Sequence, residues 1–230
     1  MPSMATRKVL MVLFDGFNTM DMNGPYEIFR MSGNRDVFTV TVAAETEITT
    51  SFEGVHIKRD VALSQTLIQS LCDVDILVVP GGPTELVERQ ASNAGGFMKL
   101  IATFNELPPR AGRLPRILLS ICTGAIFLGR MGIFLGRQCT THWGAYKNLE
   151  KTNMNAAMGH GVAGEVIPAR YVDSGLNEYG TRIISSGGVS CGMDASLYVV
   201  KLHGGEGMAC ATAEKLDYKW RESEGIVVAP

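Results

Sequence analysis

The chain has 230 residues and a formal net charge of −2, because 21 Lys and Arg residues stand against 23 Asp and Glu residues. Apolar residues make up 46% of the sequence and charged residues 19%. This composition excludes an intrinsically disordered chain, which has fewer apolar and more charged residues. The near-neutral charge argues against nucleic acid as a partner, because nucleic-acid-binding proteins normally carry a basic face. The length fits one α/β domain, and we expect residues 1–230 to form a single domain.

The cysteines and the start of the chain indicate where the protein works. The five cysteines are an odd number and include no Cys-x-x-Cys pair. Neither a disulfide framework nor a zinc site is therefore indicated, and a reducing compartment is favoured. The first apolar run, residues 9–14 (VLMVLF), is closed by Asp15 and is too short for a signal-peptide core or a membrane span. We expect a cytoplasmic protein with no membrane partner.

Three short apolar runs predict strands that are buried on both faces. These runs are residues 9–14, 76–79 and 117–119, and their content of Val, Ile and Leu is typical of parallel strands covered by helices. Small or polar residues follow each run, and helix-compatible stretches come next at residues 84–105 and 125–131. This alternation predicts an α/β fold with a mostly parallel sheet and crossover helices.

Other segments have less regular patterns. Four of them predict further strands: residues 37–44, 55–57, 137–141 and 181–186. Ala213, Leu216 and Trp220 share one face of a helical projection, which predicts a terminal helix over residues 211–222. The polar, glycine-containing residues 173–180 predict a loop.

The most informative segment is residues 120–124, SICTG, which follow an apolar strand and precede a predicted helix. A nucleophile between small residues in this context is typical of a nucleophile elbow, whose sharp turn points the side chain outward. The thiol of Cys122 is then expected at the carboxyl end of a strand, where open α/β sheets bind ligands. We expect the amide of Thr123 to stabilise an anion, and the nearby helix start to favour the thiolate. The alternative is that Cys122 is a small buried apolar residue.

A second strand ends in Pro80, Gly81 and Gly82. Because adjacent parallel strands end at the same edge of a sheet, we expect this loop to lie beside the elbow. Gly82 has no side chain to block an approaching ligand, so its amide is a candidate second donor, with Gly81 beside it. A plain turn is the alternative.

Two further side chains are candidates for proton transfer. Asp21 follows the first strand among apolar neighbours, which can raise the pKa of a carboxyl group and suit it to general acid–base work. The alternative is that Asp21 caps a helix that begins near Pro25. His142 follows the strand predicted at residues 137–141, and such a histidine can activate or orient a thiol. A hydrogen-bonded structural histidine is the alternative.

In this order and spacing, the motifs together resemble the ThiJ/PfpI superfamily, whose fold is a flavodoxin-like α/β sandwich. They are MDMNGP at residues 20–25, VPGG at 79–82, SICTG at 120–124, TTHW at 140–143 and GGVSCGMD at 187–194. Within the superfamily, the resemblance is greatest to isonitrile hydratases and to the amidase-like domains of AraC-type regulators. The features that indicate this are an aspartate at position 21, a threonine after Cys122, and the last two motifs.

The resemblance implies a reaction in which the Cys122 thiolate attacks the terminal carbon of an isocyanide to give a thioimidate. Asp21 moves the protons, and water then releases an N-substituted formamide. The amides of Gly82 and Thr123 hold the developing charge, and the pocket wall includes Gly81 and His142. The resemblance implies a small-molecule substrate and a homodimer. It implies no metal or organic cofactor, because the thiol supplies the covalent step.

Two loops depart from the hydratase pattern and leave the substrate open. Residues 173–180 are longer than the usual short turn, and residues 108–114 form an expanded, basic loop. One alternative function is glyoxalase-type conversion of 2-oxoaldehydes, which can use the same Cys122 and Asp21. Others are a reaction on a different secondary metabolite at the same thiol, and a non-enzymatic redox sensor or stress chaperone.

Overall fold

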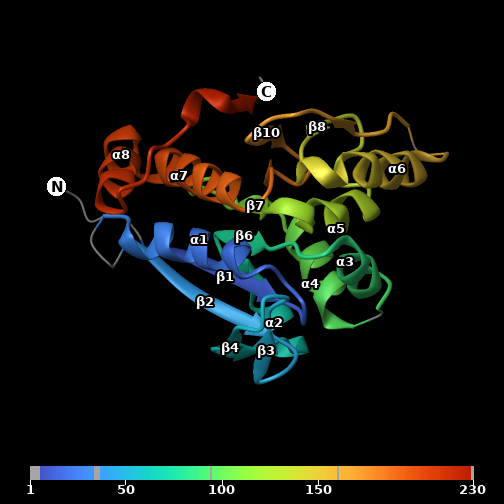
Figure 1. The fold of residues 1–230 in the computed structure, drawn as a ribbon, viewed down its shortest axis with the longest axis horizontal. Coiled ribbons are helices and arrows are strands. Elements are labelled where there is room, and N and C mark those ends of the chain that lie inside the picture. The colour runs from blue at the N-terminus through green and yellow to red at the C-terminus, as the bar shows by residue number, and fades with distance from the viewer. Residues whose placement is uncertain (1–5, 34–36, 94, 160, 229–230) are drawn as a thin grey trace.

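An eight-stranded sheet forms the centre of the molecule in the computed structural model (Figure 1). The structure describes residues 6–33, 37–93, 95–159 and 161–228. The strands of the sheet are β1 (Arg7–Leu13), β2 (Phe38–Ala44), β5 (Val61–Ala62), β6 (Ile76–Val79), β7 (Ile117–Ser120), β10 (Tyr171–Leu176), β11 (Arg182–Ser186) and β12 (Gly225–Val227). Two small sheets pair β3 (Ile48–Thr50) with β4 (His56–Lys58), and β8 (Gln138–Cys139) with β9 (Glu165–Val166).

The strand order in the central sheet is β12-β10-β11-β7-β6-β1-β2-β5. All neighbours run parallel except β10 and β11, which are antiparallel. The five strands β2-β1-β6-β7-β11 repeat the flavodoxin-like order, in which ligands bind where the direction of winding reverses. Every residue of β6 and β7 is buried, as their apolar runs predict. The predicted flavodoxin-like α/β fold is confirmed.

Helices pack around this sheet in two groups. The helices are α1 (Thr19–Met31), α2 (Gln65–Gln69), α3 (Thr84–Ala91), α4 (Gly96–Asn105), α5 (Ala125–Arg130), α6 (Tyr146–Ala157), α7 (Ser190–Gly204) and α8 (Glu206–Lys215). Helices α1, α7 and α8 pack against one another, and α5 packs against α3 and α6 (Figure 1). Short 3₁₀ turns lie at Leu71–Asp73, Cys122–Gly124, Trp143–Ala145 and Glu222–Glu224.

Helix α1 begins earlier than the sequence suggests. The side chain of Asn18 accepts hydrogen bonds from the backbone N–H groups of Met20 and Asp21, at 3.1 and 3.2 Å, and so caps the helix. Asp21 therefore lies in the first turn and is not the cap, and Pro25 lies inside the helix. Because proline has no N–H, the missing bond would have involved the carbonyl group of Asp21, one turn earlier.

Two other predictions of secondary structure are wrong. Residues 173–176 belong to strand β10 and not to a loop, because the Asp173 carboxylate accepts hydrogen bonds from Arg182 and Tyr198 at 2.6 and 2.7 Å. The helix predicted at residues 211–222 ends at Lys215. There Asp217 adopts a left-handed conformation with φ 52°, and the Tyr218 N–H bonds the Ala213 carbonyl, which closes the helix.

The sheet takes strands from both ends of the chain, since β1 and β12 belong to it. This arrangement supports the prediction that residues 1–230 form one domain, which stays a prediction. No helix in the described part of the chain is both long and apolar enough to cross a membrane.

Candidate active site

Cys122 lies on a sharp turn directly beyond strand β7. Its φ of 56° is in the left-handed region, which costs a non-glycine residue about 1–3 kcal/mol. Two glycines allow this turn to pack closely. A Cβ atom on Gly124 would lie 2.4 Å from the carbonyl oxygen of Val79, and one on Gly81 would lie 2.4 Å from Oγ1 of Thr123. The strand-turn-helix context expected for Cys122 is therefore present, with the loop after β6 against it.

Cys122 opens onto a cavity of about 410 Å³ at the carboxyl ends of the central strands. The wall combines apolar groups, backbone and a few polar side chains: Asn18, Phe52, Glu53, Gly82, Pro83, Thr84, Cys122, Thr123, His142, Gly144, Ala145 and Val189. Phe52 is exposed at this cavity, and Trp143 is exposed next to His142. Cys122, Gly82, Thr123 and His142 are thus brought together as predicted, whereas Gly81 and Asp21 lie behind the wall.

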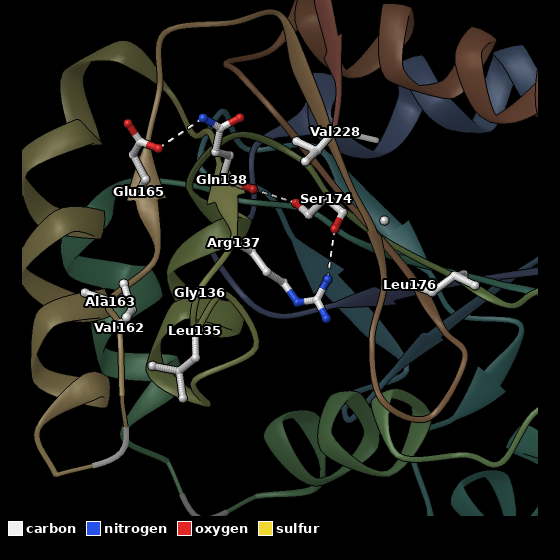
Figure 2. Close-up of a pocket in the computed structure, with 11 residues that line it drawn as sticks. Leu135, Gly136, Arg137, Gln138, Val162, Ala163, Glu165, Ser174, Leu176 and Val228 are labelled. Atoms are coloured by element: carbon white, nitrogen blue, oxygen red, sulfur yellow. Dashed lines mark hydrogen bonds between the residues drawn. The ribbon is translucent and has the colours of Figure 1, made fainter. Parts of the chain in front are cut away.

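A cavity of similar size, about 430 Å³, lies between β8, β9 and β10 (Figure 2). Its walls include Arg137, Gln138 and Glu165 but none of the predicted site residues. Arg137 donates a hydrogen bond to the Ser174 carbonyl oxygen at 2.9 Å, and Gln138 donates one to the Glu165 carboxylate at 3.0 Å (Figure 2). This second cavity contains no cysteine, and its one serine, Ser174, donates its hydroxyl to the Gln138 carbonyl at 2.6 Å. The cavity at Cys122 is therefore the candidate active site.

Asp21 is fully buried beside the thiol of Cys122. The N–H of Gly81 donates a hydrogen bond to its Oδ2 atom at 3.0 Å. Among the hydrogen bonds of the described residues, none reaches its Oδ1 atom. Burial raises the pKa of Asp21 to about 7, although the Gly81 N–H and the Cys122 thiol act in the opposite direction. A carboxyl group with this pKa can both give and take a proton near neutral pH.

The resting form of Cys122 differs from the expected thiolate. Burial, and then the charge of Asp21, raises the pKa of Cys122 to about 12, while the backbone N–H groups of Thr123 and Val189 lower it in part. Helix α5 has only six residues and begins beyond a 3₁₀ turn, so it offsets little of the cost of burial. At neutral pH the pair of Asp21 and Cys122 therefore carries at most one negative charge.

Thr123 connects the elbow to the loop after β6. Its Oγ1 atom accepts a hydrogen bond from the Gly82 N–H at 2.8 Å and donates one to the Gly82 carbonyl at 2.6 Å. The amide of Gly82 is therefore not the free donor that the sequence suggests, since the Thr123 hydroxyl occupies it. The amide of Gly81 is likewise occupied by Asp21. Both glycines hold the site together in this structure.

His142 forms part of the cavity wall. Its Nδ1 atom accepts a hydrogen bond from the Gly144 N–H at 3.2 Å, so in the neutral ring the proton lies on Nε2. The ring packs so closely on Gly188 that a Cβ atom there would lie 2.2 Å from its Cδ2. Among the hydrogen bonds of the described residues, none joins His142 to Cys122. His142 is therefore positioned as a wall residue and not as the base of a cysteine–histidine pair.

Residues that were not individually predicted as site residues complete the site, although Val189 and Thr141 lie in two of the sequence motifs. Val189 adopts φ 43° and ψ −92°, a strained conformation for a β-branched residue, and its N–H faces the pair of Cys122 and Asp21. The Thr141 hydroxyl donates to the Cys122 carbonyl at 2.8 Å and so supports the turn. The Glu53 carboxylate accepts hydrogen bonds from Asn18 and Thr19 at the cavity. The two glycines before Val189 are the signal that could have indicated its role.

Within the described part of the chain, no three His, Cys, Asp or Glu side chains are grouped so that they could hold a metal ion.

A flavodoxin-like fold with a strained cysteine and a buried acid defines a recognisable class of α/β protein. The family model that matches is the DJ-1/PfpI family, over residues 7–185. The chain belongs to the DJ-1/PfpI family.

Two curated relatives and one solved structure illustrate this membership. The chain is 26% identical over 186 residues to isonitrile hydratase of Pseudomonas putida, which covers 81% of this chain and 67% of the relative. It is 34% identical over 139 residues to "Uncharacterized protein in cpoL 5'region" of Streptomyces lividans, covering 59% of this chain and 87% of the relative. A ThiJ/PfpI family protein from Pseudomonas syringae superposes with a TM-score of 0.72 at 22% identity, over 95% of this chain and 77% of that chain. The likeness of the solved structure shows the fold alone.

Proposed function

We propose that the protein is a cysteine-dependent hydratase that converts isocyanides to N-substituted formamides. The observation that carries this proposal is the buried pair of Asp21 and Cys122 at a partly apolar cavity. An isocyanide is uncharged and needs both a nucleophile at its terminal carbon and a proton at the same carbon. A thiol beside a carboxyl group with a pKa of about 7 supplies both. The similarity to the hydratase of Pseudomonas putida adds support.

In the first half of the proposed reaction, the Asp21 carboxylate takes the proton of the Cys122 thiol. The sulfur attacks the terminal carbon of the isocyanide, and a C–S bond forms. Asp21 then gives its proton to that carbon, which leaves a neutral thioimidate on Cys122. The N–H groups of Thr123 and Val189 face the sulfur and stabilise its negative charge before attack.

In the second half, the oxygen of a water molecule attacks the thioimidate carbon while Asp21 takes a proton from that water. Asp21 then passes this proton to the thioimidate nitrogen. Transfer of the remaining hydroxyl proton through Asp21 to the sulfur breaks the C–S bond. The formamide and the neutral thiol of Cys122 are released. One isocyanide and one water thus give one formamide, and the site returns to its starting state.

The redox-sensor alternative fits the site less closely than the hydratase. A redox sensor needs an accessible thiolate, whereas Cys122 is buried and burial raises its pKa. Glyoxalase-type chemistry can use the same two side chains and is therefore an outcome of the test below.

We also propose that the protein is a homodimer and that it works in the cytoplasm. Exposed apolar side chains at and near the site support a partner surface, namely Met20 at the start of α1, Phe52 and Trp143. Light scattering on the purified chain tests the dimer, and a monomer at micromolar concentration would contradict it.

The test of the function uses cyclohexyl isocyanide and phenyl isocyanide, with formamide followed by chromatography. We expect turnover by the wild type and none by Cys122→Ala. Cys210→Ala is the matched control, because Cys210 is an exposed cysteine in α8 that does not line the cavity. Consumption of methylglyoxal without formamide would move the protein to the glyoxalase alternative. Inertness toward both kinds of substrate would reject the hydratase.

A further inference from the structure

Four arginines gather at the amino ends of the central strands, at the opposite end of β6 and β7 from Cys122. We call Arg7, Arg110, Arg113 and Arg116 the arginine cluster. Two of them come from the basic loop at residues 108–114, and Arg116 directly precedes β7. Three of them, Arg7, Arg110 and Arg113, pair with the carboxylate of Asp75, which directly precedes β6. The candidate active site uses none of these residues.

Three guanidinium groups converge on a single oxygen atom. Oδ1 of Asp75 lies 2.8 Å from Arg110, 3.4 Å from Arg113 and 3.7 Å from Arg7. Its Oδ2 atom is occupied by the backbone N–H of Lys8 at 2.8 Å. Arg116 uses its two terminal nitrogens on the carbonyl groups of Pro108 and Cys72, at 2.7 and 3.0 Å. The described ion pairs thus set three positive charges against one negative charge, and Arg116 adds a fourth positive charge that is not ion-paired.

Several donors of the cluster are buried without a partner among the described residues. They are the Nε atoms of Arg7, Arg110 and Arg116, and Nη1 of Arg110. Arg116 is only 4% exposed. A buried donor without an acceptor costs about 1–3 kcal/mol and more when it is charged, and neighbouring like charges add to that cost. A tightly bound anion would remove both costs.

His203 lies near the same cluster, in the last turn of α7. It is 8% exposed, and neither ring nitrogen has a partner among the described residues. Burial, and then the charges of Arg7 and Arg110, lowers the pKa of His203 to about 4 although Asp75 acts in the opposite direction. Burial and the charges of the arginine cluster thus act together to keep this histidine neutral near pH 7.

We propose that the arginine cluster binds a phosphate group, carried by inorganic phosphate or a small phosphomonoester. Guanidinium groups match phosphate oxygens in shape and charge, and the cluster holds unused donors on three separate arginines. The exposed fractions favour a small ligand. The side chain of Arg113 is 40% exposed and can meet a ligand from solvent, whereas those of Arg7 and Arg110 are only 13% exposed. A membrane surface or a nucleic-acid backbone would reach little more than Arg113.

The experiment compares the melting temperature of the full chain in phosphate and in chloride at equal ionic strength. A ligand that binds the folded state raises the melting temperature with a saturable concentration dependence. We expect that rise for inorganic phosphate and for phenyl phosphate, with dissociation constants then measured by calorimetry. Vesicles containing phosphatidic acid form the second arm. Binding to the vesicles without a response to free phosphate would overturn the proposal.

Arg113→Gln is the informative variant, because this half-exposed arginine holds no backbone carbonyl among the described hydrogen bonds and should not be needed for folding. Loss of one charged hydrogen-bond donor should weaken phosphate binding about tenfold or more. Arg130→Gln is the matched control, an exposed arginine in the last turn of α5, and should bind phosphate like the wild type. Equal affinities in the two variants, or no saturable response in the wild type, would show that the cluster serves only to hold the loop.

Discussion

Cys122 and Cys139 are both buried at the ends of short strands, and burial raises the pKa of each to about 12. Their surroundings are otherwise different. The Cys139 thiol donates to the Glu165 carbonyl at 3.6 Å and accepts from the Asn153 amide at 3.4 Å. Cys122 faces a cavity and has the carboxyl group of Asp21 beside it. A raised pKa therefore does not separate the candidate nucleophile from a structural cysteine.

What separates the two cysteines is the availability of a proton acceptor and the cost of their backbone conformation. Cys122 has a buried acid that can take its proton, and its left-handed backbone is kept by close packing of Gly81 and Gly124. Cys139 lies in strand β8 with both of its hydrogen-bonding roles filled by the neighbouring segments. Backbone strain is present at Cys122 and absent at Cys139, which indicates that Cys122 is the functional cysteine.

The largest effect should come from replacing each cysteine by alanine. Cys122→Ala should lower formamide formation at least about a thousandfold, because the C–S bond cannot form without the thiol. Cys139→Ala should keep turnover and lower the free energy of unfolding by about 1–2 kcal/mol, since two hydrogen bonds and a buried side chain are lost. Urea denaturation and formamide chromatography measure the two effects. Similar loss of turnover in both variants would remove the distinction between the two sites.

The next effect concerns the acid that distinguishes the two sites. Asp21→Asn should lower turnover about 10²–10⁴-fold, because general acid–base catalysis is lost. It should also lower the pKa of the Cys122 thiol, since a nearby negative charge is removed. The pH dependence of alkylation by iodoacetamide measures this pKa. The control is Asp15→Asn, which changes an exposed carboxylate between β1 and α1 and should leave both quantities as in the wild type.

Local sequence patterns predicted much of the fold and the turn at Cys122. The apolar runs at residues 76–79 and 117–119 predicted β6 and β7, and the small residues around Cys122 predicted its sharp turn. Strand β10 was missed because Asp173 interrupts its apolar pattern, and the partners of that carboxylate, Arg182 and Tyr198, lie 9 and 25 positions further along the chain.

The electrostatic state of the site could not be predicted in this way. The pKa of Asp21 depends on burial by several elements and on the N–H of Gly81, 60 positions away. The occupation of the Gly82 amide depends on a side chain 41 positions away, that of Thr123. The contribution of Val189 comes from a backbone conformation that its side-chain type disfavours. Each of these features arises from tertiary contacts, whereas sequence patterns report local preferences.

Asp21 should also make stability depend on pH in a direction opposite to that of most carboxylates. Its pKa is about 7 in the folded chain and 3.8 ordinarily, so between these values the folded state binds more protons than the unfolded state. The stabilising contribution is complete below pH 3.8 and is lost as the pH rises through 7. Asp21→Asn should thus be more stable than the wild type by a few kcal/mol at pH 8, with a smaller difference at pH 5. Urea denaturation at the two pH values measures it, and a difference that grows toward low pH would contradict the raised pKa.

The smallest effect should come from the hydrogen bonds that join the elbow to the loop after β6. Thr123→Val leaves the buried N–H and carbonyl groups of Gly82 without partners, which should lower the free energy of unfolding by about 1–3 kcal/mol. Thr123→Ser keeps the hydroxyl and should recover most of that loss. Thr123→Val should also reduce turnover and raise the pKa of Cys122, because the Thr123 side chain is one of the groups that lower it. An unchanged unfolding free energy in Thr123→Val would show that the Gly82 amide finds another partner, and would make it available again as a donor to substrate.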